Sequence, residues 1–323
     1  MSSPKKTTRK KKTPCLNRII SFDFSQRRIK QLEGADFGTF TALWWPDAPL
    51  GRLEILAYLV LWLFTWDDEI DEPTGAYSAD FSGAQQYRKR TLRFVGECLG
   101  LSSAAAAADD DDSFRPQNEI VQSFDVVGAA LRSACTVDQC QRFYDEIARF
   151  MQCSEDEQRG RLRGHIPSLD EYWHFRLGTS AVYIGTAVGE YATGMPVPPG
   201  VMRSAAVQGV WDETNVIISI TNDLMSLRKE MKLDGIDSIV PLTFSTTGNV
   251  QQAVSQSVDA LRASKERFDT AAEACLALCR DDDAVRGPVE AFIETQRSNC
   301  VGNLVWRQVL DINSCSPCLR SRC

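Results

Sequence analysis

The feature that most constrains this fold is an apolar run from Ile55 to Trp66 that leads directly into the acidic cluster Asp67–Asp71. The run holds about twelve residues, well short of the roughly 20 that a membrane-spanning helix needs. It is apolar on nearly all sides, which is typical of a helix buried in a protein core, and Pro73 and Gly75 predict where that helix stops. The sequence therefore predicts a buried helix with carboxylates at its inner end.

The rest of the chain indicates helices as well. Apolar residues recur at helical spacing at about 84–99, 119–135, 137–153, 168–188, 201–231, 250–279 and 285–311, and we expect a connector at 154–164. Ser168 is a suitable N-cap, and Gly178, Gly185 and Gly189 indicate close packing or a break in the helix that follows. The strand-like run Val216–Ile220 lies within a longer helical pattern. We predict an all-α protein of about ten to twelve helices.

Composition bounds the environment and the partners. The net charge of -7 over 323 residues argues against nucleic acid as the main partner. Eleven cysteines without a secretory signal predict reduced thiols and a cytoplasmic protein. Because the longest apolar run is too short to span a bilayer, we expect no membrane insertion. We expect a disordered basic tail at 1–14, one domain at 15–313 and an irregular tail at 314–323; a homodimer is left open. The aspartates at 109–112 and 281–283 are interpreted as solvated loops, and the pair Cys315 and Cys318 is not interpreted as a zinc site.

A second polar motif lies within Thr221–Glu230. Asn222, Ser226 and Glu230 are spaced four residues apart, so they form a ladder of oxygen donors along one helix face. Amide, hydroxyl and carboxylate oxygens suit a hard cation such as Mg²⁺. The sequence predicts a metal-binding face here.

The first acidic cluster complements this ladder. Asp67 and Asp71 share a helix face, and Asp68 lies about a third of a turn away. Carboxylates at the inner end of an apolar helix repel one another and are costly to desolvate, and cations relieve that cost. Two such faces on separate helices can hold several Mg²⁺ ions, which activate a diphosphate as a leaving group. Arg176 adds a bidentate donor for phosphate oxygens.

These motifs resemble those of class I terpene synthases of the single-domain microbial type, and fungal sesquiterpene synthases most of all. WDDEID at 66–71 resembles the family's aspartate-rich motif, and NDLMSLRKE at 222–230 resembles its second metal motif. Arg176 lies 46 residues before Asn222, where the family places its diphosphate-sensing arginine. GNLVW at 302–306 resembles a segment that contributes an aromatic residue to the pocket wall. The resemblance spans about residues 35–310.

The resemblance implies a bundle of helices around a deep apolar cavity, with three Mg²⁺ ions. It implies that Asp67 binds two ions with Asp68 and Asp71 in support, that Asn222, Ser226 and Glu230 hold the third, and that Arg176 and Lys229 bind diphosphate. Thr179 and Ser180 match the linker and the effector, whose carbonyl faces the substrate at a helix break. Phe64, Trp306 and Tyr183 are candidate aromatic faces, each stabilising a carbocation by ~0.5–2 kcal/mol in a cavity that excludes water.

The activity that the resemblance implies is ionisation and cyclisation of an isoprenyl diphosphate, with farnesyl diphosphate the expected substrate and a sesquiterpene hydrocarbon or alcohol the product. The family's C-terminal Arg-Tyr pair is absent, because Ile312 and Asn313 occupy the matching positions. We hypothesise weakened catalysis, or replacement of the pair by Arg307, Arg320 or Arg322; comparison with an Ile312→Arg, Asn313→Tyr variant tests this. Two alternatives stay open: a prenyl chain elongase, and a non-catalytic relative that binds an isoprenyl diphosphate or a partner.

Overall fold

The computed structural model describes residues 26–101, 117–233 and 235–314, with side chains at 26, 27, 229, 233 and 309–314 excluded. Within these ranges the regular structure is helical, with no strand. The helices are α2 (Gln26–Gly34), α3 (Phe37–Trp44), α4 (Leu50–Asp71), α5 (Phe81–Leu99), α7 (Glu119–Gln122), α8 (Asp125–Ala134), α9 (Val137–Leu162), α10 (Leu169–Thr179), α11 (Val182–Ala187), α12 (Gly189–Thr193), α13 (Pro199–Met202), α14 (Ala205–Glu230), α15 (Ile239–Thr247), α16 (Val250–Ala277) and α17 (Asp283–Ser314), with a 3₁₀ turn at Met231–Leu233.

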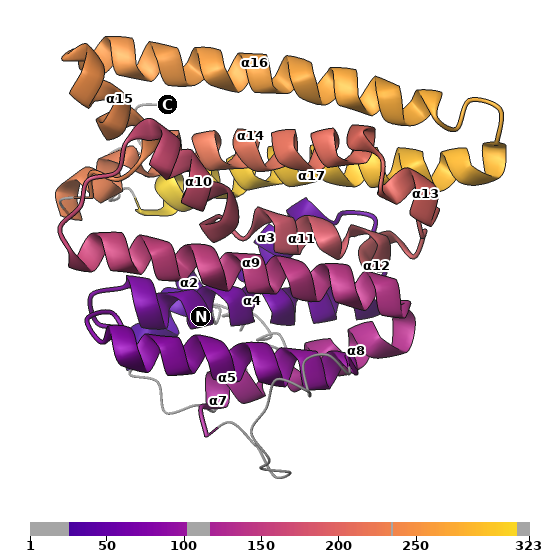
Figure 1. The fold of residues 1–323 in the computed structure, drawn as a ribbon, viewed down its shortest axis with the longest axis horizontal. Coiled ribbons are helices and arrows are strands. Elements are labelled where there is room, and N and C mark those ends of the chain that lie inside the picture. The colour runs from indigo at the N-terminus through magenta and orange to yellow at the C-terminus, as the bar shows by residue number, and fades with distance from the viewer. Residues whose placement is uncertain (1–25, 102–116, 234, 315–323) are drawn as a thin grey trace, which may run out of the picture.

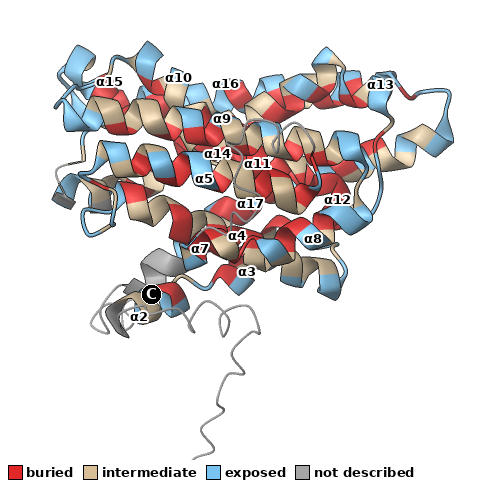
Figure 2. Ribbon diagram, turned by 60° about the horizontal axis from the view of Figure 1, so that its bottom comes forward, coloured by how far each residue is buried: buried red, intermediate tan, exposed pale blue. Residues whose placement is uncertain are grey.

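The long helices run roughly side by side (Figure 1). Helix α14 packs against α16 and α17, α17 packs against α3, and α9 packs against α10 and α5. Figure 2 shows buried residues gathered where α4, α14 and α17 face the interior, with exposed residues on the outer surfaces. The predicted all-α bundle is confirmed, and the buried helix α4 contributes to its main hydrophobic core.

Local sequence explains several helix ends. Ser168 caps α10 as predicted: its hydroxyl accepts from Glu171 N at 3.2 Å while Ser168 N donates to the Glu171 carboxylate at 2.8 Å. Helix α4 ends at Asp71, just before Pro73. The glycine-containing helix expected over 168–188 is divided at Ser180, where Ala181 takes a left-handed conformation with φ 57°.

The predicted connector at 154–164 is wrong for most of its length. Helix α9 continues to Leu162, because Ser154 and Gln158 are buried and Arg159 pairs with Glu155 and Asp156 one turn before it. Helices α2, α3 and α15 were also not predicted. Short helices such as α12 and α13 bring the number of helices in the described ranges above the ten to twelve that the sequence predicts.

No helix in the described ranges combines the length and the apolar character that crossing a bilayer requires. Seven described cysteines are free thiols. The tails expected at 1–14 and 314–323, the aspartate run at 109–112 and the Cys315 and Cys318 pair lie wholly or almost wholly outside the described residues, so those domain boundaries stay predictions.

Candidate active site

A large cavity opens between α3, α4, α10, α11, α14 and α17, with about 740 Å³ of empty space that includes its mouth. Its walls hold the first residue of each predicted metal motif, Asp67 from α4 and Asn222 from α14. Most other wall residues are apolar: Phe40, Trp44, Trp45, Leu59, Val60, Leu63, Phe64, Phe150, Ala181, Val182, Gly185, Ile218 and Trp306. This combination of an apolar wall with a few polar groups is typical of a small-molecule site.

The aspartate motif is held in place by the aromatic residue that precedes it. Trp66 is fully buried, stacks on Tyr87 with ring centroids 5.1 Å apart, and donates from Nε1 to Thr91 Oγ1 at 2.9 Å. Both partners belong to α5. Together the ring stacking and this hydrogen bond tie α4 to α5 and so fix the rotation of α4 and the direction of Asp67.

The last turns of α9 support the same motif from the other side. Arg161 Nη2 donates to the Ile70 carbonyl at 2.7 Å and lies 3.9 Å from Asp71 Oδ1. Gln158 Nε2 donates to the Tyr77 carbonyl at 2.8 Å, in the loop that follows the motif. The stretch expected to be a connector therefore positions the acidic cluster.

The aspartates are poorly compensated. Burial raises the pKa of Asp67 well above its usual value, and Asp71 and Asp68 raise it further. Burial also raises the pKa of Asp68 to about 6, even though Arg28 of α2 forms an ion pair with it. Partial desolvation raises the pKa of Asp71 too, although 45% of this side chain is exposed and water screens the effect. Such carboxylates favour a cation beside them.

Glu157 is a further acid at this site that the sequence did not reveal. Burial raises its pKa to about 8, and Asp71 adds to the shift while Arg176 opposes it. Its charge in turn contributes to the raised pKa of Asp67. Because 154–164 was expected to be a connector, Glu157 was not assigned to any helix face. The one available signal was its i,i+4 spacing to Arg161, which is typical of a helix.

The second motif forms the predicted ladder on the last turns of α14. Ser226 Oγ donates to the backbone carbonyl of Asn222 at 2.8 Å and contacts the Glu230 carboxylate one turn later. Because α14 is helical through Glu230, the four-residue spacing puts Asn222, Ser226 and Glu230 on one face, and Asn222 lines the cavity. The side chain of Lys229 lies outside the described part of the chain.

Arg176 is oriented by Asp223, the residue that follows Asn222. Its Nη2 donates to Asp223 Oδ1 at 2.7 Å, while Asp223 Oδ2 accepts from Tyr172 OH at 2.5 Å and from Ile239 N at 3.0 Å. Burial alone lowers the pKa of Arg176, but Asp223 and then Tyr172 outweigh it and hold the pKa above its usual value. Asp223 was not singled out from sequence; its place within the ND pair was the available signal.

The helix break between α10 and α11 brings Thr179 and Ser180 to the cavity wall. Ser180 Oγ donates to Asn215 Oδ1 at 2.7 Å, and Asn215 Nδ2 donates to the Leu177 carbonyl at 2.6 Å. Asn215 is fully buried on α14 and so ties the broken end of α10 to the helix that carries the second motif. Sequence reasoning did not identify Asn215.

Two of the three candidate aromatic faces lie in the cavity. Phe64 and Trp306 both line it, with ring centroids 6.1 Å apart. Trp306 is anchored by a 2.8 Å bond from Nε1 to the Ala35 carbonyl. Tyr183 is not among the lining residues; it belongs to a separate hydrophobic cluster and donates to Asp212 at 2.6 Å, so it does not contribute a ring to this cavity.

The glycines of α10 and α11 are required by close packing. A Cβ on Gly178 would lie 2.3 Å from Cys153 Sγ, and one on Gly185 would lie 2.7 Å from Trp44 Cζ3. Gly185 and Trp44 both line the cavity. The absence of a side chain at position 185 therefore admits an indole ring to the wall.

The oxygen ligands of the two motifs suit a hard cation such as Mg²⁺, and Arg176 suits a diphosphate bound to that cation. Within the described ranges, no three carboxylate, thiol or imidazole groups converge into a ready-made metal cage. Mg²⁺ commonly binds through only one or two carboxylates together with phosphate oxygens and water, which suits facing motifs on α4 and α14. Arg176 Nε is buried without a hydrogen-bond partner among the described residues and so retains a donor for an anion.

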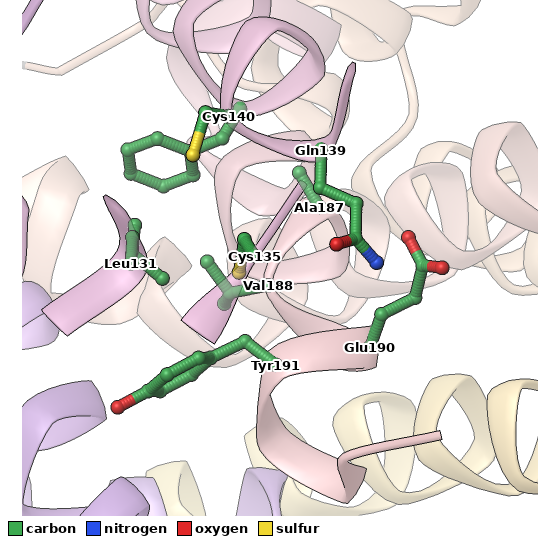
Figure 3. Close-up of a pocket in the computed structure, with 9 residues that line it drawn as sticks. Leu131, Cys135, Gln139, Cys140, Ala187, Val188, Glu190 and Tyr191 are labelled. Carbon is green, nitrogen blue, oxygen red and sulfur yellow. The ribbon is translucent and has the colours of Figure 1, made fainter. Parts of the chain in front are cut away.

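A second hollow lies between α8, α9 and α12 (Figure 3). The figure shows Gln139 and Glu190 on one side of it and Leu131 and Tyr191 on the other. Its empty space is about 250 Å³, against about 740 Å³ for the first cavity on the same measure. None of the residues that line it belongs to either metal motif.

Comparison with known proteins identifies the family. Residues 58–267 match the profile described as terpene synthase family 2, C-terminal metal binding. The chain belongs to the terpene synthase family. The matched span includes both predicted metal motifs and Arg176, so metal binding is a property of this region of the synthase.

Individual relatives belong to the same family. The synthase is 35% identical over 285 residues to sesquiterpene cyclase hepA of Aspergillus oryzae, a match that covers 88% of this chain and 77% of that protein. It is 25% identical over 293 residues to sesquiterpene synthase 6 of Postia placenta, covering 87% and 77%. Among solved structures, a-eudesmol synthase superposes with a TM-score of 0.77 at 19% identity over 91% of this chain and 92% of that one, which shows a shared fold. The predicted terpene cyclase is confirmed.

Proposed function

We propose that the synthase converts farnesyl diphosphate to a cyclic sesquiterpene, hydrocarbon or alcohol, and releases diphosphate, with three Mg²⁺ ions at the site. The observation that carries the proposal is that Asp67 and Asn222, from motifs far apart in sequence, line one aromatic cavity. The names of the relatives support a fifteen-carbon substrate, since several are sesquiterpene synthases or cyclases.

Asp67, with Asp68 and Asp71 in support, would hold ions on the α4 side, and Asn222, Ser226 and Glu230 would hold one on the α14 side. Mg²⁺ supplies Lewis-acid stabilisation of the leaving diphosphate. Arg176, kept charged and oriented by Asp223, would bind diphosphate oxygens through the donors that Asp223 does not use. Lys229 is proposed as a second diphosphate ligand on the sequence motif alone.

Departure of diphosphate leaves an allylic cation, and the chain's own residues then guide it. The break after Thr179 leaves carbonyls without helical partners near the cavity, and Ser180 is the proposed effector among them. The rings of Phe64 and Trp306 face the cavity and stabilise positive charge by about 0.5–2 kcal/mol each. The apolar wall excludes water, so the cation cyclises before it is quenched.

The effect of replacing the family's Arg-Tyr pair by Ile312 and Asn313 stays a prediction, because the side chains of these two residues lie outside the described part of the chain. Arg307 lines the cavity and its guanidinium lies 5.1 Å from the Trp306 ring centroid. It is therefore our preferred substitute for the missing arginine. Arg320 and Arg322 lie outside the described ranges.

The test is product analysis by gas chromatography after incubation with ten-, fifteen- and twenty-carbon diphosphates, with Mg²⁺ or with EDTA. We expect cyclic products from the fifteen-carbon substrate, and none with EDTA or in Asp67→Asn. Glu54→Gln, an exposed acid on the same helix, is the matched control and should retain full turnover. Absence of any hydrocarbon or alcohol from the native chain would refute the proposal, and products that require isopentenyl diphosphate would favour the elongase.

A further inference from the structure

The N-terminal helix α2 reaches the aspartate motif through one residue. Arg28 Nη2 forms an ion pair with Asp68 Oδ2, although the two residues are 40 positions apart in sequence. Their side chains are only 20% and 25% exposed, so the pair is partly shielded from water. Shielded charge-assisted bonds are worth more than surface pairs, which makes this contact significant for the site.

The contact places a cation where the proposed function requires a metal. Asp68 belongs to the proposed Mg²⁺ ligands, and a carboxylate oxygen bonded to a guanidinium is not free to bind Mg²⁺. Arg28 therefore occupies Asp68 in the metal-free synthase and competes with an incoming metal ion for this carboxylate. A Mg²⁺ ion held by the aspartates would repel the Arg28 guanidinium, and a diphosphate bound with the metal would offer it acceptor oxygens in place of Asp68.

We propose that Arg28 is an exchangeable counterion of the active site: it pairs with Asp68 until Mg²⁺ binds, and it then donates to the substrate diphosphate. This inference rests on the proposed function. It gives α2 a role in the site, and it supplies a charged diphosphate donor from the N-terminal side in a chain with Ile312 and Asn313 near its C-terminal end. Arginine suits the task because its planar fork matches both carboxylate and phosphate.

Two binding measurements on the full chain test the exchange, and neither requires turnover. Mg²⁺ affinity without substrate is measured by calorimetry, and affinity for inorganic pyrophosphate is measured at saturating Mg²⁺. We expect Arg28→Ala to bind Mg²⁺ several-fold more tightly, because its competitor is gone. We expect it to bind pyrophosphate about tenfold or more weakly, because a charge-assisted donor is lost.

The controls separate this role from a structural one. Lys30→Ala removes an exposed cation from the same helix and should leave both affinities unchanged. Arg28→Lys keeps the charge without the fork and should show both effects in weaker form; it also serves if the alanine variant unfolds, with circular dichroism as the check. Opposite shifts in the two affinities support the exchange. Unchanged affinities, or a loss of both, would overturn it, since the latter means that Arg28 only positions Asp68.

Failure of this inference is distinguishable from failure of the proposed function. If the native synthase forms cyclic products but Arg28→Ala shows no opposing shifts, the exchange is wrong and the cyclase assignment stands. If the native chain binds neither Mg²⁺ nor pyrophosphate and forms no product, both are wrong.

Discussion

Neutralising Asp68 should stabilise the metal-free synthase, which is the reverse of the usual effect of altering an active-site residue. The pKa of Asp68 is raised from 3.8 to about 6, chiefly by burial. Each pKa unit corresponds to about 1.4 kcal/mol, so the ionised carboxylate costs about 3 kcal/mol at pH 7. Asp68→Asn removes that cost. The expected gain in the free energy of unfolding is at most about 3 kcal/mol, or roughly 5 °C in melting temperature.

The stability difference between Asp68→Asn and the native chain should depend on pH. Because the folded-state pKa lies above the unfolded one, the folded metal-free synthase binds more protons between about pH 4 and pH 6, and it loses stability as pH rises through that window. The advantage of Asp68→Asn should therefore be largest above pH 7 and fall below about 1 kcal/mol near pH 4.

Urea denaturation in EDTA across this pH range measures the difference, with Glu54→Gln as the exposed-acid control on the same helix. Added Mg²⁺ should raise the melting temperature of the native chain more than that of Asp68→Asn. An Asp68→Asn variant that is less stable than the native chain in EDTA at pH 7.5 would show that its contact with Arg28 outweighs the cost of burial, and the reasoning would be wrong.

Three further substitutions have definite expected outcomes. Tyr172→Phe removes a donor to the buried Asp223 carboxylate, so we expect a loss of about 1.5–3 kcal/mol in urea denaturation and a lower kcat/KM; unchanged values for both would argue against Asp223 as the support of Arg176. Gly185→Ala places a Cβ 2.7 Å from Trp44 and should cost about 1–3 kcal/mol in thermal melts while altering the product mixture. The control Gly160→Ala has open space and should stabilise α9 by about 0.5–1 kcal/mol, and equal behaviour of the two glycine variants would contradict the packing argument. Asn303→Leu replaces a cavity-lining amide that is 3% exposed and whose Nδ2 has no partner among the described residues, so stability should not fall and gas chromatography should show a changed product spectrum; clear destabilisation would indicate a partner for that amide.

Helical periodicity was sufficient for the parts of the site that lie within one helix. The i,i+4 ladder of Asn222, Ser226 and Glu230 follows from the geometry of α14 alone, and the structure places all three on one face. Phe64, one turn before Asp67, lines the same cavity for the same reason. The cap at Ser168 was predictable because capping depends on neighbouring residues only.

Residues that make contacts between helices could not be placed from helical periodicity or capping patterns. The final turns of α9 are so highly charged that they were interpreted as a connector, yet tertiary contacts such as that of Arg161 with the Ile70 carbonyl keep them helical. Asp223 follows Asn222, a proposed metal ligand, but whether Asp223 faces Arg176 depends on how α10 and α14 pack. Asn215 has no sequence signal, because its role arises only once the helix break at Ser180 lies against it.

The electrostatics of the cavity mouth connect stability with function. Asp67, Asp68 and Asp71 are held close together by an interior that favours their neutral forms, and Arg28 and Arg161 compensate them only in part. A cation that binds there releases this repulsion, so part of its binding free energy comes from strain already present in the metal-free fold. Removing the repulsion by substitution would stabilise the chain and weaken metal binding together. The synthase thus keeps an unfavourable cluster of charge where the proposed reaction needs metal and diphosphate to bind. Contacts from α5, α9 and α2 hold this cluster in position.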